Sequence, residues 1–176
     1  MPGRITGWAS FKSRPIALVS QGIAECERAL ALDPNLARAH ALIGMGKIFS
    51  GRADETESHV KEALRISPRD DFVFQWMLYA GAAKLHLRAD EEAAVWLGRS
   101  IESNRNWALV HFFLAAALAN LDRLQEARAA TQSGLALDPK FTIHRFHVGA
   151  ATDNSSFMST REHFYAGMRK AGVPEG

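Results

Sequence analysis

The sequence has little that would cross-link the chain or anchor it in a membrane. Its one cysteine, Cys26, cannot form a disulfide within the chain, which is typical of a reducing compartment. The longest strongly apolar stretch, residues 107–118, is interrupted by His111 and is too short to span a bilayer. The apolar run at residues 16–19 is too short for the core of a signal peptide. These absences predict a cytoplasmic protein with no membrane partner.

Neither positive nor negative charge is in large excess. Lysine and arginine total 21 against 19 aspartates and glutamates, and no long basic run exists, so we expect no nucleic-acid partner. Six prolines and 13 glycines are an ordinary content, and 47% of the residues are hydrophobic. A disordered chain has less apolar surface to bury. The composition therefore predicts a folded chain with a continuous core.

No residue pattern typical of catalysis, metal binding or cofactor binding is present. Residues 44–47 lack the spacing and the hydroxyl residue of a phosphate loop. His144 and His147 lie three residues apart, but the sequence places no third ligand with them. The acidic pairs at residues 70–71 and 91–92 lie at predicted helix starts, where negative charge offsets the helix dipole. We predict no enzyme activity, no metal and no cofactor.

What the sequence does contain is an internal repeat. Four segments share a small residue, then a large aliphatic one, then a turn that ends a helix; they begin at Ala29, Ala63, Ser100 and Gly134. The spacing from Pro34 to Pro68 is 34 residues, and so is that from Arg105 to Pro139, whereas the middle spacing is 37. A fixed period of this length is typical of a solenoid. The prolines end each second helix because proline lacks an amide hydrogen.

Between these turns the chain is predicted to form pairs of helices, and no segment shows the sustained alternation of a strand. The predicted helices span residues 15–32, 37–50, 54–66, 72–87, 90–103, 107–120, 124–137, 141–148 and 159–170. Stacked pairs share one core, which requires small residues where helices cross. Gly44, Gly81 and Ala115 fill these positions on the first helices. They face Thr56, Ala93 and Ala127 on the second helices, where Thr56 is the bulky exception.

With these residues at these spacings, residues 16–141 resemble the tetratricopeptide repeat (TPR) family. The resemblance implies an all-α fold, a right-handed α-solenoid of stacked antiparallel helix pairs. It implies a half repeat at 15–36 and repeats at 37–70, 74–107 and 108–141. Residues 1–14, which contain Trp8 and Phe11, are then an N-terminal segment with part of a helix or a flexible tail, and residues 142–176 form capping helices. After a turn at residues 153–156, the last helix is expected to cover the final repeat with Phe164 and Met168 and to turn Arg161, Glu162, Arg169 and Lys170 to water.

The sequence departs from the family pattern at several positions. The usual large aromatic residue is replaced by His40, Met77 and His111, and another core position holds Lys47 and Lys84. Arg105 stands where the third proline belongs. Because His40 and His111 occupy equivalent repeat positions, we predict that they share a packing role.

A narrower resemblance concerns residues 27–34, 115–119 and 167–175. They are similar to the C-terminal repeat region of some bacterial adenylate cyclases and related signalling proteins, in which a catalytic or DNA-binding domain precedes the repeats. Since no such domain is present here, cyclase activity is not expected. The resemblance implies an alternative function, a regulatory or dimerisation segment of a bacterial nucleotidyl cyclase or transcription regulator, and a homodimer.

The TPR resemblance also implies a concave groove lined by the first helix of each pair. Its lining would be Arg38, Ala41, Met45, Ile48, Phe49, Gln75, Leu78, Ala82, Leu85, His86, Leu109, Phe112, Ala116, Ala119 and Asn120. The set is largely apolar and lacks the polar cluster with which some family members hold a C-terminal carboxylate. We predict a non-catalytic scaffold that binds a partner peptide or helix, with Met45, Phe49 and Phe112 as anchors. On this interpretation Phe112→Asp abolishes partner binding and leaves the chain folded. The alternative is that residues 15–32, the C-terminal helix or a second copy of the chain fills the groove.

Overall fold

The computed structural model describes residues 16–149 and 154–176. The predictions for residues 1–14 and for residue 153 of the turn lie outside this part of the chain. Within it, nine α-helices and no strands are present, so the all-α prediction is confirmed. The helices are α1 Ile16–Leu32, α2 Ala37–Phe49, α3 Thr56–Ile66, α4 Val73–His86, α5 Asp90–Ser103, α6 Ala108–Asn120, α7 Leu124–Leu137, α8 Ile143–Gly149 and α9 Ser155–Lys170, with a short 3-10 turn over Ala53–Glu55. The predicted bounds agree within two residues, except that α9 begins four residues earlier than residue 159.

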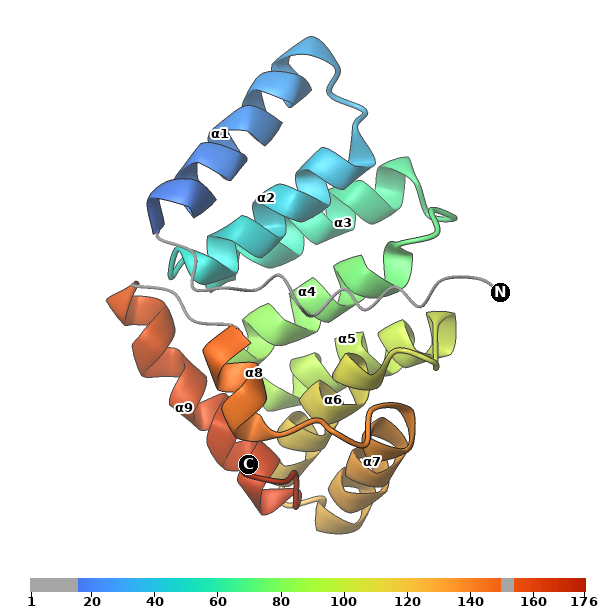
Figure 1. Ribbon diagram of the computed structural model, residues 1–176. Helices are drawn as coiled ribbons and strands as arrows, with labels where there is room; N and C mark the ends of the chain where they lie inside the picture. The colour runs from blue at the N-terminus through green and yellow to red at the C-terminus, as the bar shows by residue number, and fades with distance from the viewer. Residues whose placement is uncertain (1–15, 150–153) are drawn as a thin grey trace.

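The helices stack in antiparallel pairs along one axis, as an α-solenoid (Figure 1). The close pairs need small residues at their crossings, as predicted. A Cβ added to Gly81 would lie 2.6 Å from Leu97 Cγ of the paired helix, closer than two carbons can approach. The bulky exception, Thr56, is buried and donates its hydroxyl to the Gly44 carbonyl oxygen at 2.9 Å. That bond satisfies the one polar group which Thr56 brings into the crossing.

The two repeat-equivalent histidines make the same contact. His40 Nε2 lies 3.2 Å from the carbonyl oxygen of Pro34, and His111 Nε2 lies 2.9 Å from that of Arg105. In each case the partner lies six residues earlier, in the turn that ends the preceding helix. The predicted shared packing role is confirmed.

Two lysines in core positions are neutralised by glutamates of neighbouring helices. Lys47 Nζ lies 3.1 Å from Glu55, and Lys84 Nζ lies 2.8 Å from Glu57 and also contacts Glu92. Lys84 therefore links α3, α4 and α5. Hydrogen bonds from Lys84 and from Lys61 lower the pKa of Glu57 to about 2. Each lysine replaces an apolar core contact with an ion pair, which explains why the departure from the family pattern leaves the stack intact.

The last two helices fold back over the stack, and α9 runs along the solenoid axis across the ends of three helices (Figure 1). A Cβ on Gly167 would lie 2.6 Å from the carbonyl oxygen of Ala116 in α6. Near the middle of α9, Thr160 Oγ1 lies 2.7 Å from His86 Nδ1 in α4. At its start, Asn154 Nδ2 donates to the Ser50 carbonyl oxygen, at 3.3 Å, just beyond α2. Helix α9 thus crosses α2, α4 and α6 near their C-terminal ends.

The sequence prediction for this helix was wrong for Arg161, Ser155 and Ser156 and right for the other named residues, since Glu162, Arg169 and Lys170 are exposed as expected. Phe164 and Met168 are buried in the largest core cluster, as expected. Arg161 was expected to face water, yet only 3% of it is exposed. Ser155 and Ser156 were expected in a turn but begin the helix, because Asn154 Oδ1 accepts a hydrogen bond from the Phe157 amide at 2.8 Å and so provides the N-cap.

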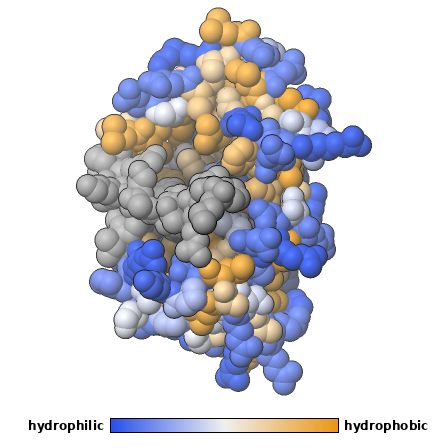
Figure 2. Space-filling model, turned by 45° about the vertical axis from the view of Figure 1, so that its right-hand side comes forward, coloured by the Kyte–Doolittle hydropathy of each residue, from blue (hydrophilic) through white to orange (hydrophobic). Residues whose placement is uncertain are grey.

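The opposite end of the stack, at α1 and α2, exposes leucines. Leu32 is 90% exposed and Leu18 57%, and Leu42 of α2 is also exposed. Figure 2 shows hydrophobic residues gathered in this upper part of the molecule. In the described part of the chain, no helix combines the length and the hydrophobicity that a membrane crossing requires.

Candidate functional site: a groove between the inner helices and α9

A groove with a cavity volume of about 390 Å³ runs along the inner side of the stack. Helices α2, α4 and α6 form its floor, and α8 and α9 form a wall. Its lining is dominated by aromatic side chains: Phe49, Phe72, Phe74, Tyr79, Trp107, Phe113, Phe141, Phe146, Phe157, Phe164 and Tyr165. The few polar residues include Gln75, Asn104 and Arg161. A largely apolar cleft with a few placed polar groups is the usual form of a binding site.

The structure brings about half of the predicted groove residues together. Met45, Ile48, Phe49, Gln75, Leu78, Ala82, His86 and Leu109 line the cavity. Some of these also contact the wall helix, since the ring centroids of Phe49 and His86 lie 5.2 Å and 4.7 Å from that of Phe157. Part of the inner surface is therefore covered by the chain's own C-terminal helix, and the rest remains a groove beside it.

The other predicted residues, Arg38, Ala41, Leu85, Phe112, Ala116, Ala119 and Asn120, are not part of the cavity lining. Arg38 pairs with Asp70 at 3.3 Å and covers the Phe72 ring. Leu85 is 1% exposed and Phe112 is completely buried. The Phe112 ring stacks on Phe141 with centroids 3.8 Å apart. The prediction of Phe112 as a partner-binding anchor is therefore wrong, because no part of it reaches the surface.

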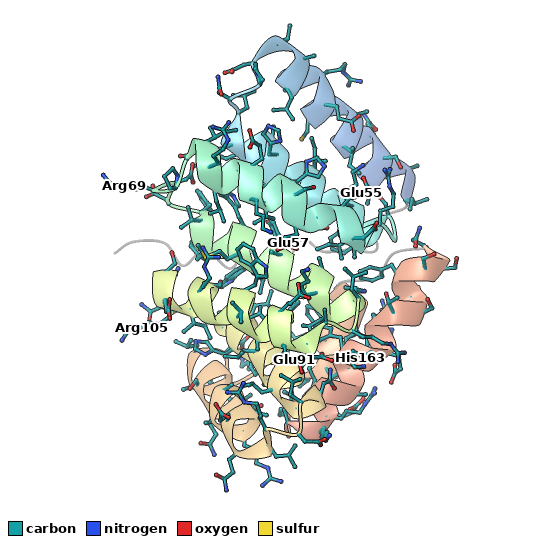
Figure 3. The ribbon with its side chains drawn as sticks, turned by 180° about the vertical axis from the view of Figure 1, so that it is seen from behind. Glu55, Glu57, Arg69, Glu91, Arg105 and His163 are labelled. Atoms are coloured by element: carbon teal, nitrogen blue, oxygen red, sulfur yellow. The ribbon has the colours of Figure 1, made fainter. Side chains whose placement is uncertain are left out.

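Asn120 instead belongs to a polar cluster that fixes α9. Asp90, at the start of α5, accepts a hydrogen bond from Asn120 Nδ2 at 2.9 Å and lies 2.9 Å from His163 Nε2. His163 comes from α9, so the cluster joins α5, α6 and α9. Figure 3 shows His163 reaching toward the start of α5, beside Glu91. Within the described residues, no three His, Cys, Asp or Glu side chains are grouped as metal ligands.

Sequence reasoning gave the C-terminal helix only as an alternative occupant of the groove, although a signal for the wall that this helix forms was present. Phe157, Arg161, Phe164 and Met168 recur at helical spacing and form one face of α9. All four are buried. This pattern places Arg161 on the apolar face of its helix. The prediction that it faces water rested on the polar outer face expected of a terminal capping helix.

Arg161 is the one charged residue that α9 contributes to the cavity lining, and its pairing is incomplete. Its Nη2 lies 2.8 Å from Nδ1 of His147 in α8, and its guanidinium lies 5.3 Å from the Tyr165 ring centroid. Its Nη1 is buried and has no hydrogen-bond partner in the described part of the chain. No ion pair joins Arg161 to a carboxylate of the described residues. Among the described residues, therefore, no carboxylate offsets the charge of this guanidinium in the groove.

The histidines beside Arg161 are held neutral. Burial, and then the charge of Arg161, lower the pKa of His86 to about 4. Desolvation and then Arg161 also lower the pKa of His147. Burial raises the pKa of Tyr165 to about 12. At neutral pH these three groups are uncharged, so Arg161 provides the charge at this place in the groove.

The neutral state of His86 makes stability depend on pH. An unfolded histidine has a pKa near 6.5, so between about pH 6.5 and 4 the unfolded chain binds a proton that the folded chain does not. The contribution of His86 to the free energy of unfolding is fully present above pH 6.5. It is lost as the pH falls through this window, by up to about 3 kcal/mol. Urea unfolding at pH 7 and 4.5 measures the loss. His86→Gln should reduce it, whereas the same change at the exposed His144 should not; equal losses in both variants would contradict the assignment.

No protein-family model and no curated protein matches the sequence, but solved structures resemble the fold. The crystal structure of MamA has a TM-score of 0.61 at 18% identity, and the match covers 85% of this chain and 84% of that one. YrrB, described as a TPR protein with an unusual peptide-binding site, has a TM-score of 0.59 at 22% identity over 89% of this chain and 77% of that one. MamA from Desulfovibrio magneticus RS-1, residues 41 to the end, has a TM-score of 0.58 at 17% identity, with coverages of 88% and 94%. At these identities the likeness shows the fold.

Proposed function

We propose that this chain, which folds as a TPR solenoid, is a non-catalytic protein-interaction module that binds a peptide or helix of a partner in the groove beside α9. The observation that carries the proposal is the open aromatic groove itself, about 390 Å³ in volume and built on packed helices. The peptide-binding site named for YrrB, a protein of the same fold, supports it. The alternative of a cyclase-type regulatory segment has no structural feature in its favour.

The lining of the groove fits apolar side chains of a partner segment. Aromatic side chains offer large contact areas at low entropic cost, and they carry much of the energy at protein interfaces. Gln75 and Asn104, both half-buried in the lining, supply donors and acceptors for a partner backbone. An apolar groove between helices is also the usual receptor for an amphipathic segment.

Filling the groove is expected to remove binding. Random 12-residue peptides displayed on phage would be selected on the purified chain, and selected peptides would be measured by fluorescence anisotropy. Gln75→Trp adds bulk inside the cavity without adding charge, so it should weaken binding by about tenfold or more, since displaced anchors at an interface commonly cost over 1 kcal/mol each.

Gln132→Trp is the matched control for this measurement, because Gln132 is exposed on α7, away from the cavity lining. It should leave affinity unchanged. Both variants should keep the helical circular dichroism spectrum of the wild type. Peptides that bind Gln75→Trp as tightly as the wild type would show that the groove is not the binding site.

A further inference from the structure

We propose that the groove recognises an acidic side chain of its partner, with Arg161 binding the carboxylate of a glutamate or aspartate that has apolar residues on both sides. This inference rests on the proposed function and specifies the chemistry of the partner. The observation behind it is that Arg161 of α9 is buried and incompletely paired.

A buried guanidinium without a counter-ion is unfavourable for the isolated chain. Arg161 is 3% exposed, and its Nη1 has lost water without gaining an acceptor from residues 16–149 or 154–176. An unsatisfied donor and an unpaired charge both cost free energy on burial. A leucine or methionine at this position of an apolar helix face would avoid that cost. The arrangement becomes favourable when an anion enters the groove and pairs with Arg161.

None of the described groups around Arg161 provides a negative charge, so we expect the partner to provide it. From α8 and α4 it faces His147 and His86, whose pKa values are lowered so that both are neutral. On α9 the nearest acid in sequence, Glu162, is exposed and pairs with Arg169 at 2.7 Å. The other cation of the lining, Arg145, has Asp138 at 3.9 Å. Arg161 is therefore the lining cation whose charge no described carboxylate offsets.

The position of Arg161 along α9 indicates an acidic residue within a segment. Its guanidinium lies 5.9 Å from the Phe157 ring centroid on one side and 5.3 Å from that of Tyr165 on the other. Phe157 and Tyr165 both line the cavity, so apolar surface extends in both directions from the charge. A free inorganic anion would use none of that surface. A carboxylate on a chain with apolar neighbours would use all of it, and a planar guanidinium pairs well with a carboxylate.

The test compares peptides that differ at one group. Phage-selected 12-residue peptides would be synthesised with capped ends, each with its acidic residue or with the matching Gln or Asn. On the wild-type chain we expect the acidic form to bind about 10- to 100-fold more tightly by calorimetry. On Arg161→Met the two forms should bind within about twofold of each other. Arg161→Lys, which keeps the charge but not the planar fork, should give an intermediate preference. Arg128→Met, at an exposed position of α7, is the control and should keep the full preference.

Thermal unfolding separates a binding role of Arg161 from a structural one, because only a structural role predicts that Arg161→Met lowers the unfolding temperature. Because Arg161 is incompletely paired, Arg161→Met should unfold at the same temperature as the wild type or higher. A large drop in unfolding temperature together with an unchanged preference for acidic peptides would overturn the inference. So would equal binding of the acidic and amide peptides to the wild-type chain, a comparison that involves no variant.

Failure of the inference and failure of the proposed function give different results. If the acidic and amide forms bind equally but Gln75→Trp abolishes binding of both, the groove binds partners without recognising a carboxylate. If selected peptides bind regardless of Gln75→Trp, or if the selection yields none, the groove proposal is overturned and the inference with it.

Discussion

Phe112→Asp is expected to unfold the helix stack and not merely to remove a binding contact. Phe112 is completely buried, its ring stacks on Phe141, and a Cβ on Gly134 of α7 would lie 2.8 Å from it. Deleting a buried phenylalanine costs about 3–5 kcal/mol, and burying a carboxylate in its place adds several more. The sum is comparable to the entire stability of a small domain. The variant should therefore lose its helical circular dichroism and its cooperative unfolding at 25 °C.

The control for this substitution is Leu87→Asp, at a residue that is 46% exposed where α4 ends. There an added carboxylate stays in water, and the free energy of unfolding should change by no more than about 0.5 kcal/mol. Urea denaturation followed at 222 nm measures both variants. A folded Phe112→Asp chain that fails only in peptide binding would restore Phe112 to the groove and would contradict its observed burial.

The family pattern misplaced Phe112 for a physical reason. The TPR resemblance places the equivalent position on an open concave surface, and the repeat period alone does not show which residues of that surface the C-terminal segment covers. Here the chain returns after α7, so that Phe141 and the following helices pack against α6. Contacts between segments distant in sequence determine the burial of Phe112. A repeat period does not predict such contacts.

The local features, in contrast, were predictable. Helix bounds followed from prolines, glycines and apolar spacing, and α5 and α7 begin and end at the predicted residues. Small residues such as Gly81 indicated helix crossings because only they allow backbones to approach closely. Each of these rules connects residues within one helix pair.

The placement of α9 lay between these two cases. The spacing of its apolar residues predicted which side of α9 is buried. It did not predict which helices pack against that side. Phe164 and Met168 fit a cap on the last repeat as well as a helix lying across three repeats. Arg161 was the distinguishing residue, since it shares that face, and arginine is so seldom buried that its position was assigned to water. In this helix the apolar stripe predicted the burial of Arg161 better than its residue type did.

Gly167→Val is expected to detach α9 from the stack. The added Cβ would meet the Ala116 carbonyl oxygen at 2.6 Å and Asn120 Oδ1 at 2.8 Å. A main-chain oxygen within α6 cannot rotate away, so the helix must move. Overpacking of this kind costs about 3 kcal/mol or more, and the loss falls on the weakest attached unit. Hydrogen exchange should therefore show amides of residues 157–170 losing protection while those of α2 to α5 keep it.

Gly98→Ala is the matched control, since a Cβ at Gly98 meets no atom within 4 Å. It replaces a glycine inside α5 and should stabilise the chain by about 0.5–1 kcal/mol through helix propensity. Unchanged protection of α9 in Gly167→Val would show that α6 and α9 are not in the close contact described.

The same variant decides whether α9 blocks the groove or forms part of it. If the helix only covered an inner surface that partners use, detaching it would expose Phe49 and His86 and raise peptide affinity. In the structure, however, Phe157, Arg161 and Tyr165 of α9 supply the aromatic wall and the charge of the cavity. Detaching the helix removes all three at once. Gly167→Val should therefore weaken peptide binding and abolish the preference for an acidic residue, which a purely covering helix would not do.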